Sequence, residues 1–157
     1  MRLHILAVGR LRGGPEAALV ADYLARFDRT GRPLGLGPAQ VIEVEDKRNA
    51  GPAAEAALLA AALPRGATLA VLDERGDTPD SPGLARLLQR LADTGTRDLA
   101  IAIGGADGLD PGFRAQAAHA LSFGRMVWPH MLARAMLAEQ LYRAASILTG
   151  SPYHRGG

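Results

Sequence analysis

The last residues of the chain place three chemically capable side chains in consecutive positions. Tyr153, His154 and Arg155 offer an aromatic ring, an imidazole that titrates near neutral pH and a guanidinium. A chain end is often frayed and without function, and this interpretation stays open. The alternative hypothesis is that His154 or Tyr153 meets a substrate while Arg155 binds a phosphate or a carboxylate.

Three loops that follow strand-like segments form a second group of candidates. Leu72 leads into the first loop, Gly104 to Gly108 give a Gly-Gly-x-x-Gly sequence in the second, and the third runs from Gly124 to His130. Residues that follow parallel strands gather at one edge of the sheet, where ligands bind. The glycines either only turn the chain or let a ligand approach the backbone. The chain has no G-x-G-x-x-G after its first strand and no P-loop sequence, which disfavours dinucleotide and P-loop sites.

Two features of these loops have alternative interpretations. Trp128, the only tryptophan, is expected either to fill the core, which we favour, or to stack on a base or adenine ring. Asp73 and Glu74 are adjacent, so on a strand they would point to opposite sides and could not act as a paired acid and base. A role in the turn is the expectation for both.

The last predicted helix carries further candidates. His130 precedes it, and its simplest role is that of a cap or a buried imidazole. Glu139 and Arg143 are four residues apart on this helix, so we expect an ion pair between them. The four histidines have neither thiolate partners nor the spacing of a metal site, and we therefore expect no metal.

Composition limits what can position these side chains. The 157 residues are 48% hydrophobic and 22% charged with a net charge of +2, which predicts one globular domain over residues 1–157 and excludes intrinsic disorder. The chain has no cysteine, which excludes disulfide and thiolate chemistry. Its longest apolar run, residues 56–63, is too short to cross a bilayer, so we expect neither a membrane span nor secretion.

Hydrophobic patterning predicts alternating strands and helices. This alternation with short connections is typical of an α/β fold with a mostly parallel sheet and helices on both faces. The predicted strands are Leu3–Val8, Val41–Val44, Thr68–Asp73, Leu99–Ile103 and Ala120–Phe123. The predicted helices are Pro15–Phe27, Pro52–Leu63, Pro82–Asp93 with Ser81 as its cap, Pro111–Ala118 and Leu132–Leu148.

Several of these motifs occur together in one known family. The chain contains Ile-Gly-Gly-Ala-Asp-Gly-Leu at 103–109, Trp-Pro-His at 128–130, Glu-Gln-Leu-Tyr-Arg-Ala at 139–144 and Ser-Pro-Tyr-His-Arg at 151–155. In this order and spacing the chain resembles the ribosomal RNA large-subunit methyltransferase H family. The likeness extends from Leu-Ala-Val-Gly at 6–9 to the C-terminal tail.

The resemblance implies a fold and an activity. The family belongs to the SPOUT class, whose members have a C-terminal trefoil knot and form homodimers with the cofactor site at the interface. It implies transfer of a methyl group from S-adenosylmethionine to N3 of a pseudouridine in large-subunit ribosomal RNA on the assembled ribosome, and hence a cytoplasmic protein. Such chemistry needs no metal, because the cofactor supplies the electrophile.

The resemblance also assigns residues. His154 would act as base or orienter, Tyr153 would position the target base and Arg155 would contact RNA. Relatives often have serine and threonine at Gly124 and Val127, so contacts there would pass to the backbone. The residues that would contact the cofactor are Leu72, Gly105, Gly124, Arg125, Met126, Val127, Trp128 and Pro129. The residues that would frame the pocket and the dimer seam are His130, Arg134, Glu139 and Arg143.

Two other functions stay open. A SPOUT methyltransferase that acts on transfer RNA would share most of these motifs. A non-catalytic, flavodoxin-like binding module would use the glycine loops only as turns.

Overall fold

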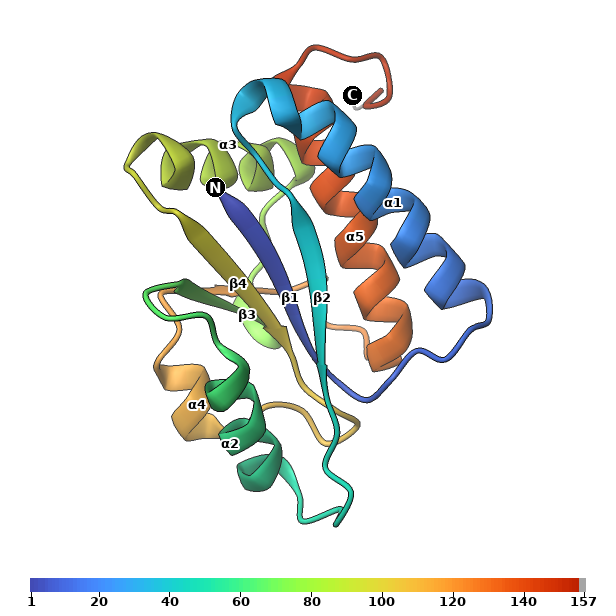
Figure 1. Ribbon diagram of the computed structural model, residues 1–157, viewed down its shortest axis with the longest axis vertical. Coiled ribbons are helices and arrows are strands. Elements are labelled where there is room, and N and C mark those ends of the chain that lie inside the picture. Colours follow the sequence, from blue (N-terminus) through green and yellow to red (C-terminus); the bar gives the residue numbers. More distant parts are fainter. Residues whose placement is uncertain (156–157) are drawn as a thin grey trace.

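A computed structural model describes residues 1–155 and shows a five-stranded sheet in which every paired neighbour is parallel. The strand order is β2-β1-β4-β3-β5 (Figure 1). The strands are β1 Arg2–Val8, β2 Ala39–Val44, β3 Thr68–Asp77, β4 Asp98–Ile103 and β5 His119–Leu121. The predicted fold class is confirmed.

Helices alternate with these strands. They are α1 Pro15–Gly31, α2 Pro52–Ala62, α3 Ser81–Asp93, α4 Pro111–Ala115 and α5 His130–Leu148, with a short 3-10 helix η1 at Arg32–Leu34. Four of them, α1 to α4, carry a proline in the first turn. Proline lacks an N–H that would be unsatisfied there and has a backbone angle suited to a helix, so it marks these starts in the sequence.

Each face of the sheet buries its own apolar cluster. On one face, β1 residues such as Leu3 and Ile5 pack with α1, α3 and α5; on the other, Leu6 and Val8 pack with α2 and α4. Side chains alternate between the faces of a strand, which places these two sets on opposite sides. Figure 1 shows α1, α3 and α5 on one side of the sheet and α2 and α4 on the other.

Some predicted boundaries were wrong. The predicted cap Ser81 is the first residue of α3, and the cap is Asp80, whose carboxylate accepts a hydrogen bond from the Gly83 N–H at 2.7 Å. The Ser81 hydroxyl donates to Gln140 Oε1 on α5 at 2.8 Å instead. Helix α1 continues four residues beyond Phe27, and α4 ends three residues before Ala118.

The end of β3 curls around β5. Leu72 and Asp77 of β3 both pair with Leu121 of β5, so the chain between them arches over the end of that strand. Gly76 lies so close that an added Cβ would sit 2.7 Å from the backbone of Ala120 and Leu121. The arch is longer than the predicted strand, which ended at Asp73.

An ionic cluster fastens the opposite, amino-terminal edge of the sheet. Two nitrogens of Arg2 reach the two oxygens of Asp98 at 2.8 Å each, and buried His4 Nε2 lies 2.8 Å from Asp98 Oδ1. These hydrogen bonds lower the pKa of Asp98 to about 2 from 3.8. The carboxylate therefore stabilises the fold above pH 3.8, its unfolded value, and this stabilisation is lost as the pH falls toward 2.

Replacing the Asp98 carboxylate should make the midpoint of thermal unfolding depend less on pH below pH 6. In Asp98→Asn the midpoint of thermal unfolding is expected to fall at pH 6 and to converge on that of the wild type near pH 2. Asp93→Asn serves as the control, because Asp93 is exposed. Calorimetric unfolding from pH 6 to pH 2 measures both curves, and parallel curves for Asp98→Asn and wild type would contradict the assignment.

No helix among residues 1–155 combines the length and the apolar character needed to cross a membrane.

Candidate functional site

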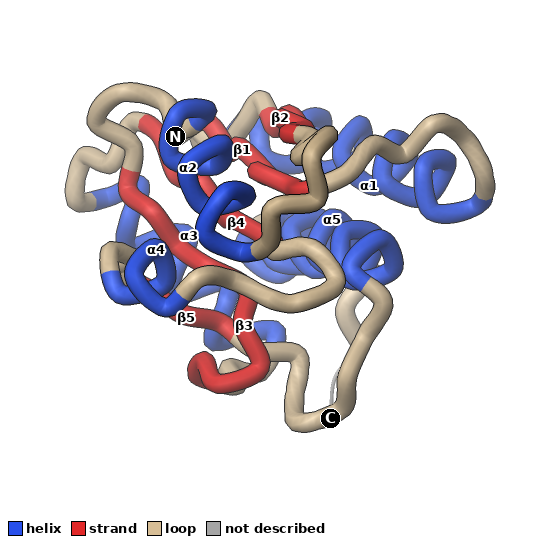
Figure 2. The backbone as a smooth tube through the Cα atoms, turned by 90° about the horizontal axis from the view of Figure 1, so that it is seen from below, coloured by secondary structure: helices blue, strands red, loops and turns tan. Residues whose placement is uncertain are grey.

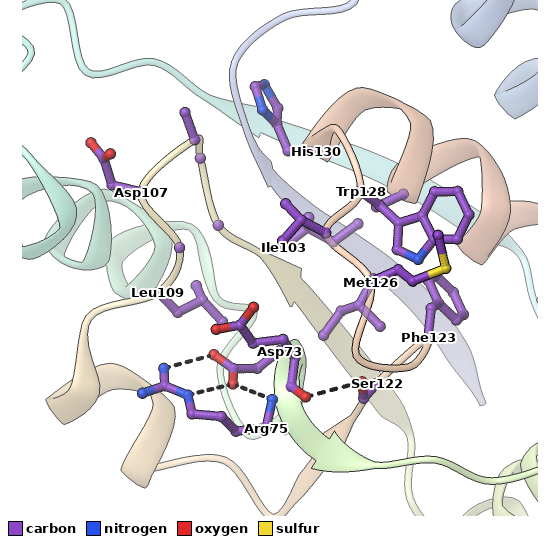
Figure 3. A pocket seen from close by; sticks show the side chains of 18 of the residues that line it. Asp73, Arg75, Ile103, Asp107, Leu109, Ser122, Phe123, Met126, Trp128 and His130 are labelled. Atoms are coloured by element: carbon purple, nitrogen blue, oxygen red, sulfur yellow. Dashed lines mark hydrogen bonds and ion pairs between the residues drawn. The ribbon is translucent and has the colours of Figure 1, made fainter.

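A cavity of about 320 Å³ lies at the carboxyl-terminal edge of the sheet, where the loops after β3, β4 and β5 meet (Figure 3). This volume lies within the range of small-molecule sites. Parallel strands end together at this edge, so the topology alone brings the three loops into one wall. Of the residues expected to contact a cofactor, the cavity wall contains Leu72, Gly105, Gly124, Met126, Val127 and Trp128, whereas Arg125 and Pro129 are outside it.

The glycine turn after β4 is closely packed. Gly105 and Gly108 form an isolated antiparallel bridge, and Gly108 has a positive φ of 80°. A Cβ on Gly104 would sit 2.7 Å from the Gly108 backbone, whereas one on Gly105 would meet the Glu55 carboxylate at 2.8 Å. Glycine is therefore required at Gly104 by rigid backbone and disfavoured at Gly105 only by a side chain. Gly104, Gly105 and Gly108 present only backbone to the cavity, which fits the close approach of a ligand.

The second half of β3 contributes a charged wall. Asp73 Oδ1 accepts from the Arg75 N–H at 2.9 Å and from Arg75 Nε at 3.0 Å, and Arg114 Nε lies 3.6 Å away. Burial opposes ionisation of Asp73, but the hydrogen bonds from Arg75 outweigh it and hold the pKa of this carboxyl below its usual value. A role in a turn or at the rim was expected for Asp73 and Glu74; both lie within β3, at the rim of the cavity. The sequence placed the segment that contains Asp73, Glu74 and Arg75 at the ligand-binding edge, but only Leu72 of it was expected to contact the cofactor.

The loop after β5 forms the most apolar part of the wall. The Ser122 hydroxyl shapes it by accepting from the Gly124 N–H at 3.0 Å. Met126 and Val127 are 71% and 84% exposed, and Trp128 is 38% exposed. The favoured prediction that Trp128 fills the core is therefore wrong, and its ring lies beside the cavity (Figure 3). Large exposed apolar side chains in one segment are typical of a surface that another molecule covers.

His130 is the first residue of α5 and lines the cavity. The cap position belongs to Pro129, so the predicted capping role is wrong, and His130 is only half-buried. The ring lies against the turn after β1, where a Cβ on Gly9 would be 3.7 Å from His130 Nε2. Gly9, where the loop after β1 begins, therefore lies next to the cavity wall.

Arg134 lies one turn farther along α5 and is 1% exposed. Its Nη2 donates to the carbonyl oxygens of Val8 and Gly9 at 3.3 and 3.1 Å, and Nη1 lies 3.7 Å from Glu43 Oε2. Burial lowers the pKa of this guanidinium. Arg134 therefore supports the turn after β1 from inside the molecule and presents no charge at the surface.

The C-terminal tail packs on α5 of its own chain. Tyr153 Oη donates to Glu139 Oε1 at 2.9 Å, Arg143 Nη2 donates to the same oxygen at 2.6 Å, and Arg143 lies over the Tyr153 ring at 4.9 Å. Arg143 Nη1 lies 3.3 Å from His154 Nδ1, and the rings of Tyr142 and Tyr153 are 4.5 Å apart. The predicted ion pair of Glu139 and Arg143 is confirmed. These contacts contradict the frayed-end interpretation for residues 151–155.

This tail cluster is separate from the cavity. None of residues 151–155 lines the cavity wall. Glu139 is six residues beyond Ala133, the last α5 residue of that wall, a distance of about 9 Å along a helix. Figure 1 shows the segment that follows α5 at the opposite end of the molecule from the carboxyl ends of the strands. The two groups of candidates thus occupy different places on one chain.

No group of three or more metal-ligating side chains that could hold a metal ion occurs within the described residues.

Comparisons with known proteins agree with this geometry. A family model described as "Predicted SPOUT methyltransferase" matches residues 1–154. A protein of Ruegeria pomeroyi named ribosomal RNA large subunit methyltransferase H is 68% identical over 155 residues, which is 99% of this chain and 99% of that protein. Proteins of the same name from Cereibacter sphaeroides and Roseobacter denitrificans are 66% and 65% identical over the same lengths.

A solved structure shares the fold at much lower identity. The crystal structure of a probable methyltransferase from Bordetella pertussis Tohama I is 20% identical and has a TM-score of 0.52 over 92% of this chain and 96% of that chain.

Proposed function

Because the chain belongs to the ribosomal RNA large subunit methyltransferase H family of SPOUT methyltransferases, we propose that it methylates N3 of a pseudouridine in large-subunit ribosomal RNA on the assembled ribosome. Membership of this family assigns methylation of ribosomal RNA with S-adenosylmethionine. The target atom and the ribosomal substrate are the finer parts of the proposal. A ribosomal substrate also places the protein in the cytoplasm.

We assign the cofactor to the cavity at the carboxyl-terminal edge of the sheet. The observation that supports this is the glycine turn at 104–108, which offers peptide groups where a side chain would collide. Leu72 and Trp128 supply apolar surface for the adenosyl portion, and Gly124 lets the loop after β5 approach closely. The bound cofactor supplies an electrophilic methyl group, so the chain itself has to align the acceptor and favour its deprotonated form.

We propose a homodimer in which the tail of one chain serves the cavity of the other. The tail holds Tyr153, His154 and Arg155, yet it packs on Glu139, about 9 Å along α5 from Ala133 of the cavity wall of its own chain. The exposed side chains of Met126 and Val127 beside that cavity provide an apolar surface for a second copy. Under this arrangement Glu139 and Arg143 face the seam together with the tail that they hold.

Within the tail, the contacts favour the orienting role of His154 over the role of base. Arg143 can only donate, so it occupies the Nδ1 lone pair of His154 and leaves the proton of the neutral imidazole on Nε2. That N–H can donate to a carbonyl beside the target N3 and stabilise the imide anion. Burial and the neighbouring Tyr23 and Glu139 raise the pKa of Tyr153, so its phenol stays protonated and positions rather than deprotonates. We assign Arg155 to the RNA.

Methyl transfer from labelled S-adenosylmethionine tests the proposal. Assembled ribosomes, free large subunits and transfer RNA are offered separately. The expected result is labelling of large-subunit ribosomal RNA in ribosomes, with the label lost when the target pseudouridine is replaced by uridine. If only transfer RNA is labelled, the proposal is wrong and the chain is a SPOUT methyltransferase that acts on transfer RNA.

Two glycine variants test the cofactor site by binding alone. Gly104→Ala pushes a methyl group into rigid backbone, and we expect S-adenosylmethionine affinity to fall about 100-fold or more, roughly 3 kcal/mol. Gly105→Ala meets only the flexible end of Glu55, and we expect a loss of about tenfold or less. Titration calorimetry measures both, with circular dichroism to verify folding. Absence of binding by the wild type at millimolar cofactor would favour the non-catalytic module.

A further inference from the structure

Two loops at the edge of the sheet form one continuous surface beside the cavity. Residues 9–14 follow β1 and residues 45–51 follow β2, and the two strands end together because Val8 pairs with Val44. The loops are also joined directly, since Arg10 Nε lies 3.3 Å from Glu45 Oε2. Figure 1 shows both loops at the edge of the sheet where β1 and β2 end, the edge that faces the viewer in Figure 2.

The carboxylates of this surface are already engaged. Glu43 accepts from the Leu11 N–H at 3.0 Å and lies near buried Arg134, and Glu45 is in the ion pair that joins the loops. Asp46 accepts from the N–H groups of Arg48 and Ala50 at 3.1 and 2.6 Å, so it holds its own loop. Arg134 therefore offsets Glu43 and Arg10 offsets Glu45, which leaves Asp46 as the one carboxylate of these loops set against their other cations.

Three cations remain without a carboxylate partner. Arg12, Lys47 and Arg48 are exposed, and none forms an ion pair within the part of the chain that the structure describes. The surface adjoins the cavity, because the turn at Gly9 touches His130 of the cavity wall. Uncompensated positive charge next to a substrate site attracts a polyanion.

Beyond this surface the rim of the cavity has the other sign. Glu74 of β3 and Asp107 of the loop after β4 line the cavity and are exposed, and Arg75 is bound to Asp73. A nucleic acid backbone that crossed this rim would meet carboxylates. The backbone on either side of a base held in the cavity is therefore drawn toward the loops after β1 and β2.

We propose that Arg12, Lys47 and Arg48 bind phosphates of the ribosomal RNA that carries the target base, an inference that rests on the proposed function. The contacts are to phosphate, so they position the RNA without reading its sequence. Each phosphate contact contributes about one unit to the slope of log affinity against log salt. Removing all three charges should then reduce that slope by roughly 2 to 3.

The test compares two triple variants of the full chain. Arg12→Gln/Lys47→Gln/Arg48→Gln removes the charges beside the cavity. Arg32→Gln/Arg65→Gln/Arg97→Gln removes three exposed arginines from η1 and the loops that precede β3 and β4, at the opposite edge of the sheet. Both lose the same net charge, so the comparison separates a local contact from general attraction.

Binding to purified assembled ribosomes is measured from about 50 to 200 mM KCl. The first triple is expected to bind about tenfold or more weakly, with the smaller salt slope and with unchanged affinity for S-adenosylmethionine. The control triple should retain the wild-type slope to within about one unit. Equal losses in both triples would overturn the proposal, because net charge alone would then account for the binding.

Methylation by the wild type separates this inference from the function on which it rests. If wild-type protein methylates ribosomal RNA and the first triple keeps the wild-type KM and salt slope, the phosphate contacts are refuted and the proposed function stands. If the wild type transfers no methyl group to ribosomal RNA, the proposed function itself fails.

Discussion

A chain that ends at Pro152 is expected to bind S-adenosylmethionine normally and to transfer no measurable methyl group. The truncation removes Tyr153, His154 and Arg155, and also residues 156–157, which are outside the described part of the structure. It keeps the Ser151 N–H that donates to the Ser146 carbonyl at 2.9 Å and closes the end of α5. Loss of an acid–base or orienting group lowers turnover about 10² to 10⁴-fold. Single-turnover methylation and cofactor calorimetry measure the two properties.

The point variant His154→Ala separates chemistry from packing. It leaves Tyr153 bound to Glu139, so the tail should stay in place while turnover falls about 100-fold or more. Ser151→Ala provides a control in the same segment, because its backbone hydrogen bond survives. Wild-type turnover by the truncated chain would show that the active site lies elsewhere.

Mixed dimers test whether the tail acts on the partner's cavity. A truncated chain and a Gly104→Ala chain are each expected to be inactive alone. If the tail acts between chains, half of a random mixture consists of mixed dimers with one intact site, which restores about one quarter of wild-type activity. No recovery on mixing would place the tail over the cavity of its own chain.

Replacing buried Arg134 by methionine is expected to cause the largest loss of stability. The change keeps most of the volume but leaves the carbonyls of Val8 and Gly9 without this donor and removes the cation beside the Glu43 carboxylate. Removing one partner of a buried polar network costs about 3 kcal/mol. For a chain of this length the unfolding midpoint should fall by about 6 to 12 °C.

Two further variants identify the cause of that loss. Arg134→Lys keeps the charge but cannot span both carbonyls, and it should be intermediate. Glu43→Gln removes only the more distant partner, and we expect a loss of about 1 kcal/mol. Calorimetric unfolding compares all three with the wild type, and an Arg134→Met midpoint within 2 °C of wild type would contradict the role assigned to the guanidinium.

Much of the local structure was readable from the sequence because it depends on neighbours in the chain. Proline in the first turn of four helices and short apolar strands predicted the order of the elements and the parallel sheet. The ends of helices were harder to predict where contacts with distant side chains determine them. Asp80 rather than Ser81 caps α3, because Ser81 instead bonds to Gln140, 59 residues away.

The cavity wall was predictable only in part. Leu72, Gly105 and the loop from Gly124 follow strands, and parallel strands bring such positions together. Trp128 was predicted to fill the core because a large aromatic side chain usually gains free energy by burial. Only the path of the loop after β5 shows that its ring borders the cavity.

By itself, the sequence determined which elements form, since proline, glycine and apolar spacing act over a few residues, and its motifs identified the family. The tertiary structure decided which elements come into contact: the arch of β3 over Leu121, the burial of Arg134 under Gly9 and the seat of Tyr153 on Glu139. These contacts join residues that are distant in the chain. Their energies depend on how whole elements are placed relative to one another, so no periodic pattern in the sequence reveals them.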